Sequence, residues 1–481
     1  MKHKCIRWIG LSLLLCTISL FAIYSFREKD SLTVEAASET STRDTVMEPE
    51  ESNAVSYDFI GGKDVMPIGA YYGPHLYNMC WDGNESPQLI TEEQFQLAAE
   101  LGINVFDKCE IERVDYDKTI YKLLELGEKY GIGIMPLDKV LNARGESILT
   151  PTEFGKRLAP IRDYDAWVAV YLVDEPSTSY WYPDNFDRYV ESFKDIGNLI
   201  HNEMNLVSFG NLFPMGSVTF KNDFEKYVKE WIDTTNPKFL IWDEYPFNES
   251  YGGDMGAYIV STSIMRKYAQ EYNISFRAFI QAGDHFYRSG MDTLPYWPNE
   301  AQFNWNINTA LEYGAQGISY FPYYEVSGLS IDSDAKVDAY RNGFIGVGGN
   351  KTIWYYYAQN IHKHIKEIDH VLMNSVHKGV IIKGKQTADD FEGAYGVLEG
   401  EKFNELQAVY GDDVMVGCLN YNGRSALYVV NYSMEYAQRI TLEFDAKHDI
   451  TITQLGETSY VRGDALTLDM AAGEGILLVI E

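Results

Sequence analysis

The chain has 481 residues, of which 46% are hydrophobic, and a formal net charge of -30 at pH 7. This charge argues against nucleic acid and anionic membrane surfaces as partners, because both are polyanions, and more weakly against a strongly anionic polysaccharide. The length exceeds one ordinary domain and suits a barrel of roughly 250 to 350 residues with a smaller module beside it.

Residues 1–36 predict a signal peptide or an N-terminal anchor. Basic residues precede an apolar run over residues 8–24, and the small residues Val34 and Ala36 stand at the spacing of a cleavage site. The protein would contact a membrane only if this segment stays uncleaved. Residues 37–56 are polar and acidic without an apolar period, which predicts a disordered linker.

Few cysteines remain once residues 1–36 are set aside: Cys80, Cys109 and Cys418. They are too few and too scattered for a disulfide framework or a zinc site, so we expect no metal and no cofactor. An exported chain with so little cysteine suits a secreted or cell-surface protein of a Gram-positive bacterium.

Residues 57–371 repeat a strand and a helix eight times, which is the number of a closed (β/α)8 barrel. The alternative is an open doubly wound sheet, which usually has fewer strands and a glycine-rich phosphate turn after the first one; that turn is absent here. The expected strands are 65–72, 103–109, 132–137, 167–173, 206–212, 239–243, 276–281 and 317–321. The expected helices are 91–101, 117–130, 152–161, 184–203, 223–234, 255–272, 300–313 and 336–370.

Residues 372–481 change to short apolar runs separated by Asn-Gly, Gly-Asp and Gly-Glu turns, which is typical of antiparallel strands. The expected strands begin near residues 379, 414, 426, 439, 450 and 475. The fold class predicted for the whole chain is therefore α/β, a (β/α)8 TIM barrel followed by a small antiparallel β-sandwich domain. For the second domain we expect a lid or packing role before a sugar-binding one.

The fourth expected strand is apolar almost throughout and ends in Asp174 and Glu175. Such a run is typical of a strand buried on both faces of a parallel sheet. Pro176 prevents further pairing and favours an extended backbone at Glu175. A carboxylate at this end of a barrel strand is either catalytic or an acidic cap of the strand.

The sixth expected strand ends in the same way, with Asp243 and Glu244 before Tyr245 and a proline. Because the carboxyl ends of barrel strands meet at one rim, we expect their polar side chains to surround one pocket. Glu175 and Asp243 are the catalytic candidates. The substrate-binding candidates are Tyr72, Asp107, Asp138, Asp174, Asn211, Glu244, Tyr245, Gln281, Tyr320 and Tyr323.

Two carboxylates across a pocket are what glycoside cleavage requires, because one protonates the leaving oxygen while the other acts as nucleophile or base. The alternative is a Ca²⁺ or Mg²⁺ site with oxygen ligands from Asp107, Asp138, Asp174 and Asp243. We favour hydrolysis because Tyr, Trp and Asn crowd the same rim and suit a neutral polyol.

Val-Asp-Glu-Pro at residues 173–176 resembles the acid/base strand of clan A glycoside hydrolases. Trp-Asp-Glu-Tyr-Pro-Phe at 242–247 resembles a strand of bacterial clan-A-like barrels, and residues 304–324 resemble the last helix and strand of those barrels and of β-galactosidase-like enzymes. Stretches near residues 413 and 427 look like their appended β-sandwich.

The resemblance covers about residues 60–481 and implies Glu175 as the general acid/base. It departs from clan A at the seventh strand, where Gln281 stands in place of the nucleophilic Glu. Asp243 is then the nearest partner, with Glu244 on the opposite face of an alternating strand. Strands two apart on the rim could leave room for a water between the carboxyls, which would mean inversion.

Two functions follow. The first is an exported glycoside hydrolase that acts on a neutral oligosaccharide or glycan through Glu175 and Asp243. The alternative is a non-catalytic carbohydrate-binding barrel, which the glutamine at the end of the seventh strand would favour.

Overall fold

The structure is a computed structural model, and it describes most of the chain from residue 65 onward. The described residues are 65–71, 73–74, 89–111, 116–138, 152, 155–156, 159–175, 194–195, 197–198, 207–215, 224–247, 255–283, 298–324, 343–346 and 348–481. The expected signal segment and linker lie outside them, as does most of the expected helix 184–203.

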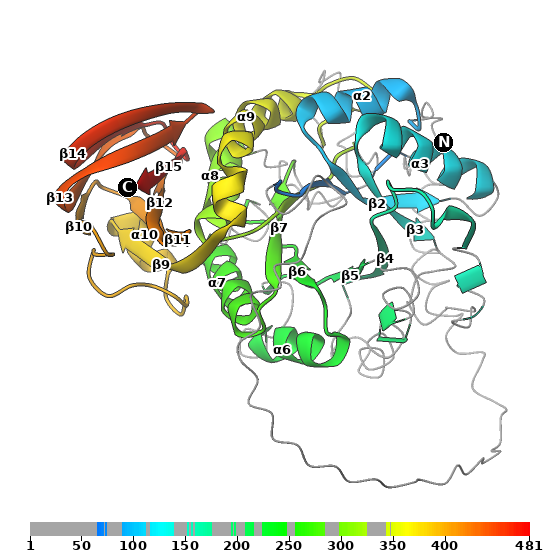
Figure 1. Cartoon of the computed structure of the whole chain (residues 1–481), viewed down its shortest axis with the longest axis horizontal. Helices are drawn as coiled ribbons and strands as arrows, with labels where there is room; N and C mark the ends of the chain where they lie inside the picture. Colours follow the sequence, from blue (N-terminus) through cyan, green and yellow to red (C-terminus); the bar gives the residue numbers. More distant parts are fainter. Residues whose placement is uncertain are drawn as a thin grey trace, which may run out of the picture. The chain divides into compact units, whose positions relative to one another are not determined.

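A parallel sheet of six strands, in the order β3-β2-β1-β8-β7-β6, forms the first layer of the fold (Figure 1). Its strands are β1 (Ile68–Ala70), β2 (Val105–Ile111), β3 (Gly133–Asp138), β6 (Phe239–Trp242), β7 (Ser275–Gln281) and β8 (Ile318–Phe321). A further parallel pair comprises β4 (Ala169–Asp174) and β5 (Val207–Asn211).

Two isolated parallel bridges connect that pair to the larger sheet. One joins Ile134 of β3 to Trp167, just before β4, and the other joins Leu212, just after β5, to Trp242 of β6. The pair thus lies between β3 and β6, where its place in the sequence puts it.

Two of the described parallel strands, β2 and β4, carry an extra residue, which changes the side their residues face. Phe106 and Cys109 of β2, three residues apart, pair with Ile134 and Pro136 of β3, which are only two residues apart. In β4, a shift of the same kind separates Tyr171 from Val173. An inserted residue breaks the alternation of side chains between the two faces of a strand. Beyond it, a prediction that assumes strict alternation puts each side chain on the wrong face.

Helices accompany the parallel strands at the expected places. The described ones are α2 (Glu92–Leu101), α3 (Tyr116–Tyr130), the short 3-10 helix η2 (Ala159–Ile161), α6 (Phe224–Thr235), α7 (Met255–Glu271), α8 (Glu300–Glu312) and α9 (Ile353–Met373). The side chain of Thr91 accepts the backbone N–H of Gln94, as the capping sequence predicts.

Two helix expectations need correction. For the helix expected over residues 336–370, residues 336–342 lie outside the described ones; α9 begins at Ile353, and before it Ile345 forms bridges with Tyr324 and Lys351. The helix expected over residues 152–161 ends in the 3-10 turn of η2.

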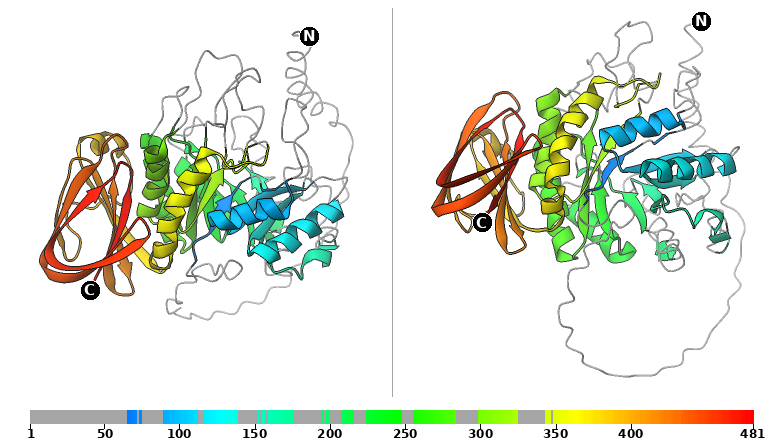
Figure 2. Two further views of the ribbon diagram at one scale, coloured as in Figure 1. Left: turned by 90° about the horizontal axis from the view of Figure 1, so that it is seen from above. Right: turned by 45° about the horizontal axis from the view of Figure 1, so that its top comes forward.

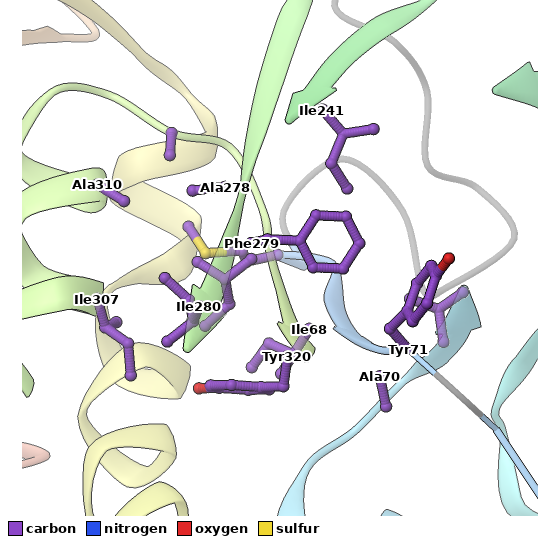
Figure 3. Close-up of a cluster of buried hydrophobic side chains, with 14 of the residues drawn as sticks. Ile68, Ala70, Tyr71, Ile241, Ala278, Phe279, Ile280, Ile307, Ala310 and Tyr320 are labelled. Atoms are coloured by element: carbon purple, nitrogen blue, oxygen red, sulfur yellow. The ribbon is translucent and has the colours of Figure 1, made fainter. Parts of the chain in front are cut away.

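Aromatic and aliphatic side chains fill the space inside the parallel strands and beneath the helices (Figure 3). The rings of Tyr71 and Phe279 meet edge to face, with 5.3 Å between their centroids. Tyr71 also contacts Phe321, at 5.4 Å. Residues from β1, β7 and β8 thus share one buried core.

The C-terminal part is an antiparallel sheet of seven strands, next to α8 (Figure 2). It comprises β9 (Ser375–Lys383), β10 (Leu406–Tyr410), β11 (Val414–Tyr421), β12 (Arg424–Asn431), β13 (Gln438–Gln454), β14 (Glu457–Met470) and β15 (Gly475–Ile480), with α10 (Lys385–Asp390) after β9. The two strands expected near 439 and 450 are one long strand, β13, and β10 and β14 are additional.

The long strand β13 changes neighbours along its length. Its first half pairs with β10 and its second half with β15, and its pairing with β14 shifts between Glu443 and His448. Apolar side chains of these strands form a second core. In the described part of the chain, no helix has both the length and the apolar character needed to cross a membrane.

Candidate active site at the strand ends

Glu175 follows β4 in an unusual backbone conformation. Its φ is 47°, in the left-handed region, whereas Pro176 predicted an extended backbone. The expectation is therefore wrong. The Glu175 N–H donates to the carbonyl of Asn211 at 2.9 Å, which extends the pairing with β5 by one residue. A glutamate held at positive φ is strained, and such strain is concentrated at functional sites.

Asp243 stands on the other side of the end of β5. Its N–H donates to the carbonyl of Leu212 at 3.3 Å, just as Glu175 bonds to Asn211. The two acids therefore flank consecutive residues of one strand end, from opposite sides. Since neighbouring strands lie about 4.8 Å apart, the two backbones are separated by roughly 10 Å.

The hydroxyl of Tyr227 in α6 lies just beyond the end of β5. It accepts a hydrogen bond from the N–H of Phe213 at 3.3 Å. Burial raises the pKa of Tyr227 well above its usual value, and the negative charges of Glu175 and Asp243 raise it further. The charges of both acids therefore act on the same tyrosine.

Glu244 acts on a different neighbour from Asp243. Burial raises the pKa of Tyr258 in α7, and the negative charge of Glu244 raises it further. Both Glu244 and Asp243 are buried, at 7% and 6% exposure. The charges of these two consecutive acids thus act on different tyrosines, one in α7 and one in α6.

A cluster of polar aromatic residues around Lys108 completes the described part of the rim. The Lys108 amine donates to the Tyr71 hydroxyl at 3.0 Å, and this hydroxyl lies 3.2 Å from that of Tyr171. The amine also lies 4.7 Å from the centre of the Tyr71 ring. Tyr171 and Tyr227 were not predicted from the sequence, because one stands inside an apolar run and the other on a helix.

Gln281 does not present its amide to a ligand. Its side-chain oxygen accepts the N–H of Phe247 at 3.0 Å, and its NH₂ donates to the carbonyls of Phe247 at 2.6 Å and Gly283 at 2.9 Å. The side chain therefore fastens the segment after β6 to the end of β7. We do not carry Gln281 into the proposed site.

Asp107 is fully buried between strands. It accepts a hydrogen bond from the hydroxyl of Ser319, and its second oxygen lies 3.8 Å from the guanidinium of Arg277. Burial raises its pKa to about 6, although the Arg277 charge opposes the rise. A carboxylate closed in by β1, β7 and β8 has a structural role.

Tyr320 and Tyr323 also lie away from the acids. The Tyr320 hydroxyl is 2.6 Å from Nε2 of His362 in α9, and Figure 3 shows it directed toward the helices, away from Tyr71. Tyr323 is fully buried against Phe106. The expectation that these two tyrosines bind substrate does not match their placement.

The remaining candidates divide into two groups. Asn211 and Tyr245 are described, both nearly buried, with Asn211 beside Glu175 and the Tyr245 ring 5.8 Å from that of Phe321. Tyr72 and the side chains of Asp138 and Asp174 lie outside the described residues. Among the described residues, no three His, Cys, Asp or Glu side chains form a group that could hold a metal ion. Two ligands of the alternative Ca²⁺ or Mg²⁺ site, Asp138 and Asp174, are not among the described side chains.

No protein-family model and no curated protein matches the sequence. Among solved structures, the chain is similar to a family 39 glycoside hydrolase from Bacteroides cellulosilyticus WH2, at 10% identity and a TM-score of 0.48, over 87% of this chain and 82% of that one. It is similar to a family 5 glycoside hydrolase from Bacteroides vulgatus, at 11% identity and a TM-score of 0.49, over 86% and 89%. It is also similar to a β-galactosidase from Marinomonas ef1, at 10% identity and a TM-score of 0.45, over 69% of this chain and 66% of that one. The chain is thus similar to solved glycosidases at low sequence identity.

Proposed function

We propose that the protein is an exported glycoside hydrolase that cleaves a neutral oligosaccharide or glycan, with Glu175 as the acid and Asp243 as the base. The observation that carries the proposal is the placement of Glu175 and Asp243 on opposite sides of the end of β5, where each pairs with one of two consecutive residues. Two acids on either side of one strand end form the minimal machinery for this reaction.

The proposed reaction gives each acid one role, with Glu175 as the acid that the resemblance implies. Glu175 is partly exposed at the strand end, where it can reach the leaving oxygen of a bound sugar and protonate it. Asp243, one strand beyond β5, would take a proton from water on the opposite face of the ring. Roughly 6.5 to 9.5 Å between carboxyl groups leaves room for that water and gives inversion.

A non-catalytic carbohydrate-binding barrel is the second candidate. It is favoured by Gln281, whose amide is engaged with Phe247 and Gly283 at the strand end where the resemblance expects a nucleophile. This candidate predicts binding without turnover, with affinity that survives loss of the Glu175 charge.

Substitution of the two acids separates the candidates. Glu175→Gln and Asp243→Asn should each lower kcat by a factor of about 10²–10⁴ on a panel of plant, mucin and microbial glycans, because each removes proton transfer. Glu230→Gln is the control, since it removes an exposed carboxylate of α6 that pairs with Lys226, and kcat should not change. Turnover that is unchanged in both acid variants, or absent from the unmodified protein on every glycan, would favour the binding barrel.

The proposed architecture is a closed (β/α)8 barrel over residues 57–371 with a β-sandwich over residues 372–481. The bridges on either side of the β4–β5 pair support closure. Residues 1–36 remain a predicted signal peptide or anchor and 37–56 a predicted linker. Expression in a Gram-positive host tests the signal peptide. N-terminal sequencing of the protein in the medium should show a chain that begins after residue 36, whereas protein found only in the cytoplasm, with Met1 still present, would contradict export.

A further inference from the structure

Tyr460 of β14 is the most exposed large hydrophobic side chain in the described part of the chain, at 80%. Among the described residues, its side chain has no hydrogen bond, ion pair or ring contact. The other exposed tyrosines that the structure describes each contact a ring or a carboxylate of the chain: Tyr356, Tyr410 and Tyr436. A tyrosine ring is a large apolar surface with a polar tip, so an uncovered one is suited to stacking on a ligand.

Tyr460 lines a groove of about 290 Å³ on β13 and β14, beside the end of β15. These two strands lie side by side (Figure 1), with Tyr460 opposite Thr451 and Arg462 opposite Asp449. Because side chains alternate between the two faces of a strand, these four lie on one face of the sheet. The volume is at the lower limit of sites that bind small molecules, about 300–1,000 Å³, and suits one ring-sized group.

Two ion pairs lie beside Tyr460. Arg462 donates to Asp449 at 3.1 Å, and Arg424 of β12 donates to Glu481, the residue after β15, at 2.8 Å. The N–H of Glu481 donates to the carbonyl of Asp449 at 2.9 Å, so the two pairs are neighbours. The charged residues that line the groove are Asp449, Arg462 and Glu481. Since each arginine is matched by an acid, the groove has no surplus positive charge to attract an anion.

These charged groups can also bond to a ligand, because all four are exposed and each pair uses only one hydrogen bond. A guanidinium has five N–H donors, and a carboxylate accepts at two oxygens. The groove therefore combines an uncovered ring with exposed donors and acceptors. This combination suits a ligand with an apolar face and hydroxyl groups around its edge, which both donate and accept.

We propose that this groove binds one sugar ring of a neutral glycan, as a second site apart from the strand-end acids. The Tyr460 ring covers the C–H face of the sugar. Hydroxyls at the edge of the sugar donate to Asp449 and accept from Arg462. The antiparallel sheet thereby has a sugar-binding role, which the sequence placed second to packing, and this role rests on neither Glu175 nor Asp243.

The test uses the full chain with Glu175→Gln, so that no probe is hydrolysed. The protein is run through native gels that contain one soluble neutral polysaccharide each: mixed-linkage β-glucan, arabinoxylan, galactomannan or α-mannan. At least one of them should retard it. Tyr460→Ala should weaken that binding about tenfold, because the stacking surface is lost, and Tyr460→Trp should restore it, because it supplies a larger ring.

Tyr410→Ala is the matched control, because it removes another exposed tyrosine of the same sheet outside the groove, and retardation should not change. The proposal is overturned if no polysaccharide retards the protein. It is also overturned if the Tyr460→Ala protein is retarded as strongly as its parent, since binding then occurs at the strand-end site alone. Retardation is read without turnover, so this test and the catalytic test can fail separately.

Discussion

Glu175 illustrates at the scale of one residue how a candidate catalytic group can be held against its own preference. Four of the other five described non-glycine residues with positive φ are asparagines, which tolerate that region. A glutamate there is disfavoured by about 1 kcal/mol or more, and the hydrogen bond to Asn211 helps hold it. The strained backbone is the observation that a functional role for this carboxylate would explain.

The first residue-scale prediction separates stability from activity. Glu175→Asn should raise the free energy of unfolding by about 1 kcal/mol, because asparagine fits the left-handed backbone, while turnover is lost. Denaturant unfolding and glycan hydrolysis measure the two effects. The reverse change, Asn273→Glu at a φ of 51°, should lower stability by a similar amount. A Glu175→Asn protein that is less stable than its parent would contradict the strain.

Gln281 shows, at the scale of elements, why a neutral amide ends β7. Its side chain both accepts from and donates to the peptide of Phe247, and so joins the segment after β6 to the next strand. A carboxylate could only accept. A glutamate at this position would place its charge against two carbonyls in a site with 1% exposure.

Restoring the glutamate that the resemblance expects should therefore damage the fold without changing the chemistry. Gln281→Glu should lower the free energy of unfolding by about 2–4 kcal/mol, through lost donors and a buried charge. The anomer released, followed by ¹H NMR, should remain that of the parent. Gln302→Glu is the control, because a glutamate can still complete the capping box of α8. An equally stable variant that retains anomeric configuration would contradict the role given to Gln281.

At the scale of the whole molecule, His377 of β9 links the antiparallel sheet to the helices of the parallel sheet. Nδ1 accepts from the guanidinium of Arg266 in α7, and Nε2 lies 2.9 Å from the carbonyl of Glu312 in α8. Burial, followed by the Arg266 charge, lowers the pKa of His377 well below its usual value. The linkage therefore depends on a neutral imidazole.

This neutral histidine predicts how acid affects stability. In the unfolded chain His377 takes up a proton as the pH falls below about 6.5, whereas in the folded chain it stays neutral, so its contribution is complete above that pH and is lost below it. His377→Gln should reduce the slope of unfolding free energy against pH by up to about 1.4 kcal/mol per unit between pH 6.5 and 4.5. Burial raises the pKa of Glu312, which acts in the opposite direction and is common to both proteins.

Denaturant unfolding across this pH range measures the slope. The matched control is His370→Gln, an exposed histidine that should leave the slope unchanged. Equal slopes in the His377→Gln protein and its parent would show that His377 is not held neutral.

The sequence alone determined the order of strands and helices, the change to antiparallel strands near residue 372 and the acids at the ends of β4 and β6. These features depend on local patterns: apolar runs, caps and turns within a few residues. The pairing of β13 with two different strands could not be seen in this way, because it depends on neighbours distant in the chain.

The tertiary structure alone decided which polar residues face the site. The extra residue in β2 breaks the alternation around Lys108, and Gln281 and Tyr320 find partners in Phe247 and His362, which are distant in sequence. The Tyr227 hydroxyl reaches the N–H of Phe213, just beyond β5, only because α6 packs there in the folded chain. A local pattern records which groups reach a strand end, but the direction and partners of each side chain depend on contacts that form only when the chain folds.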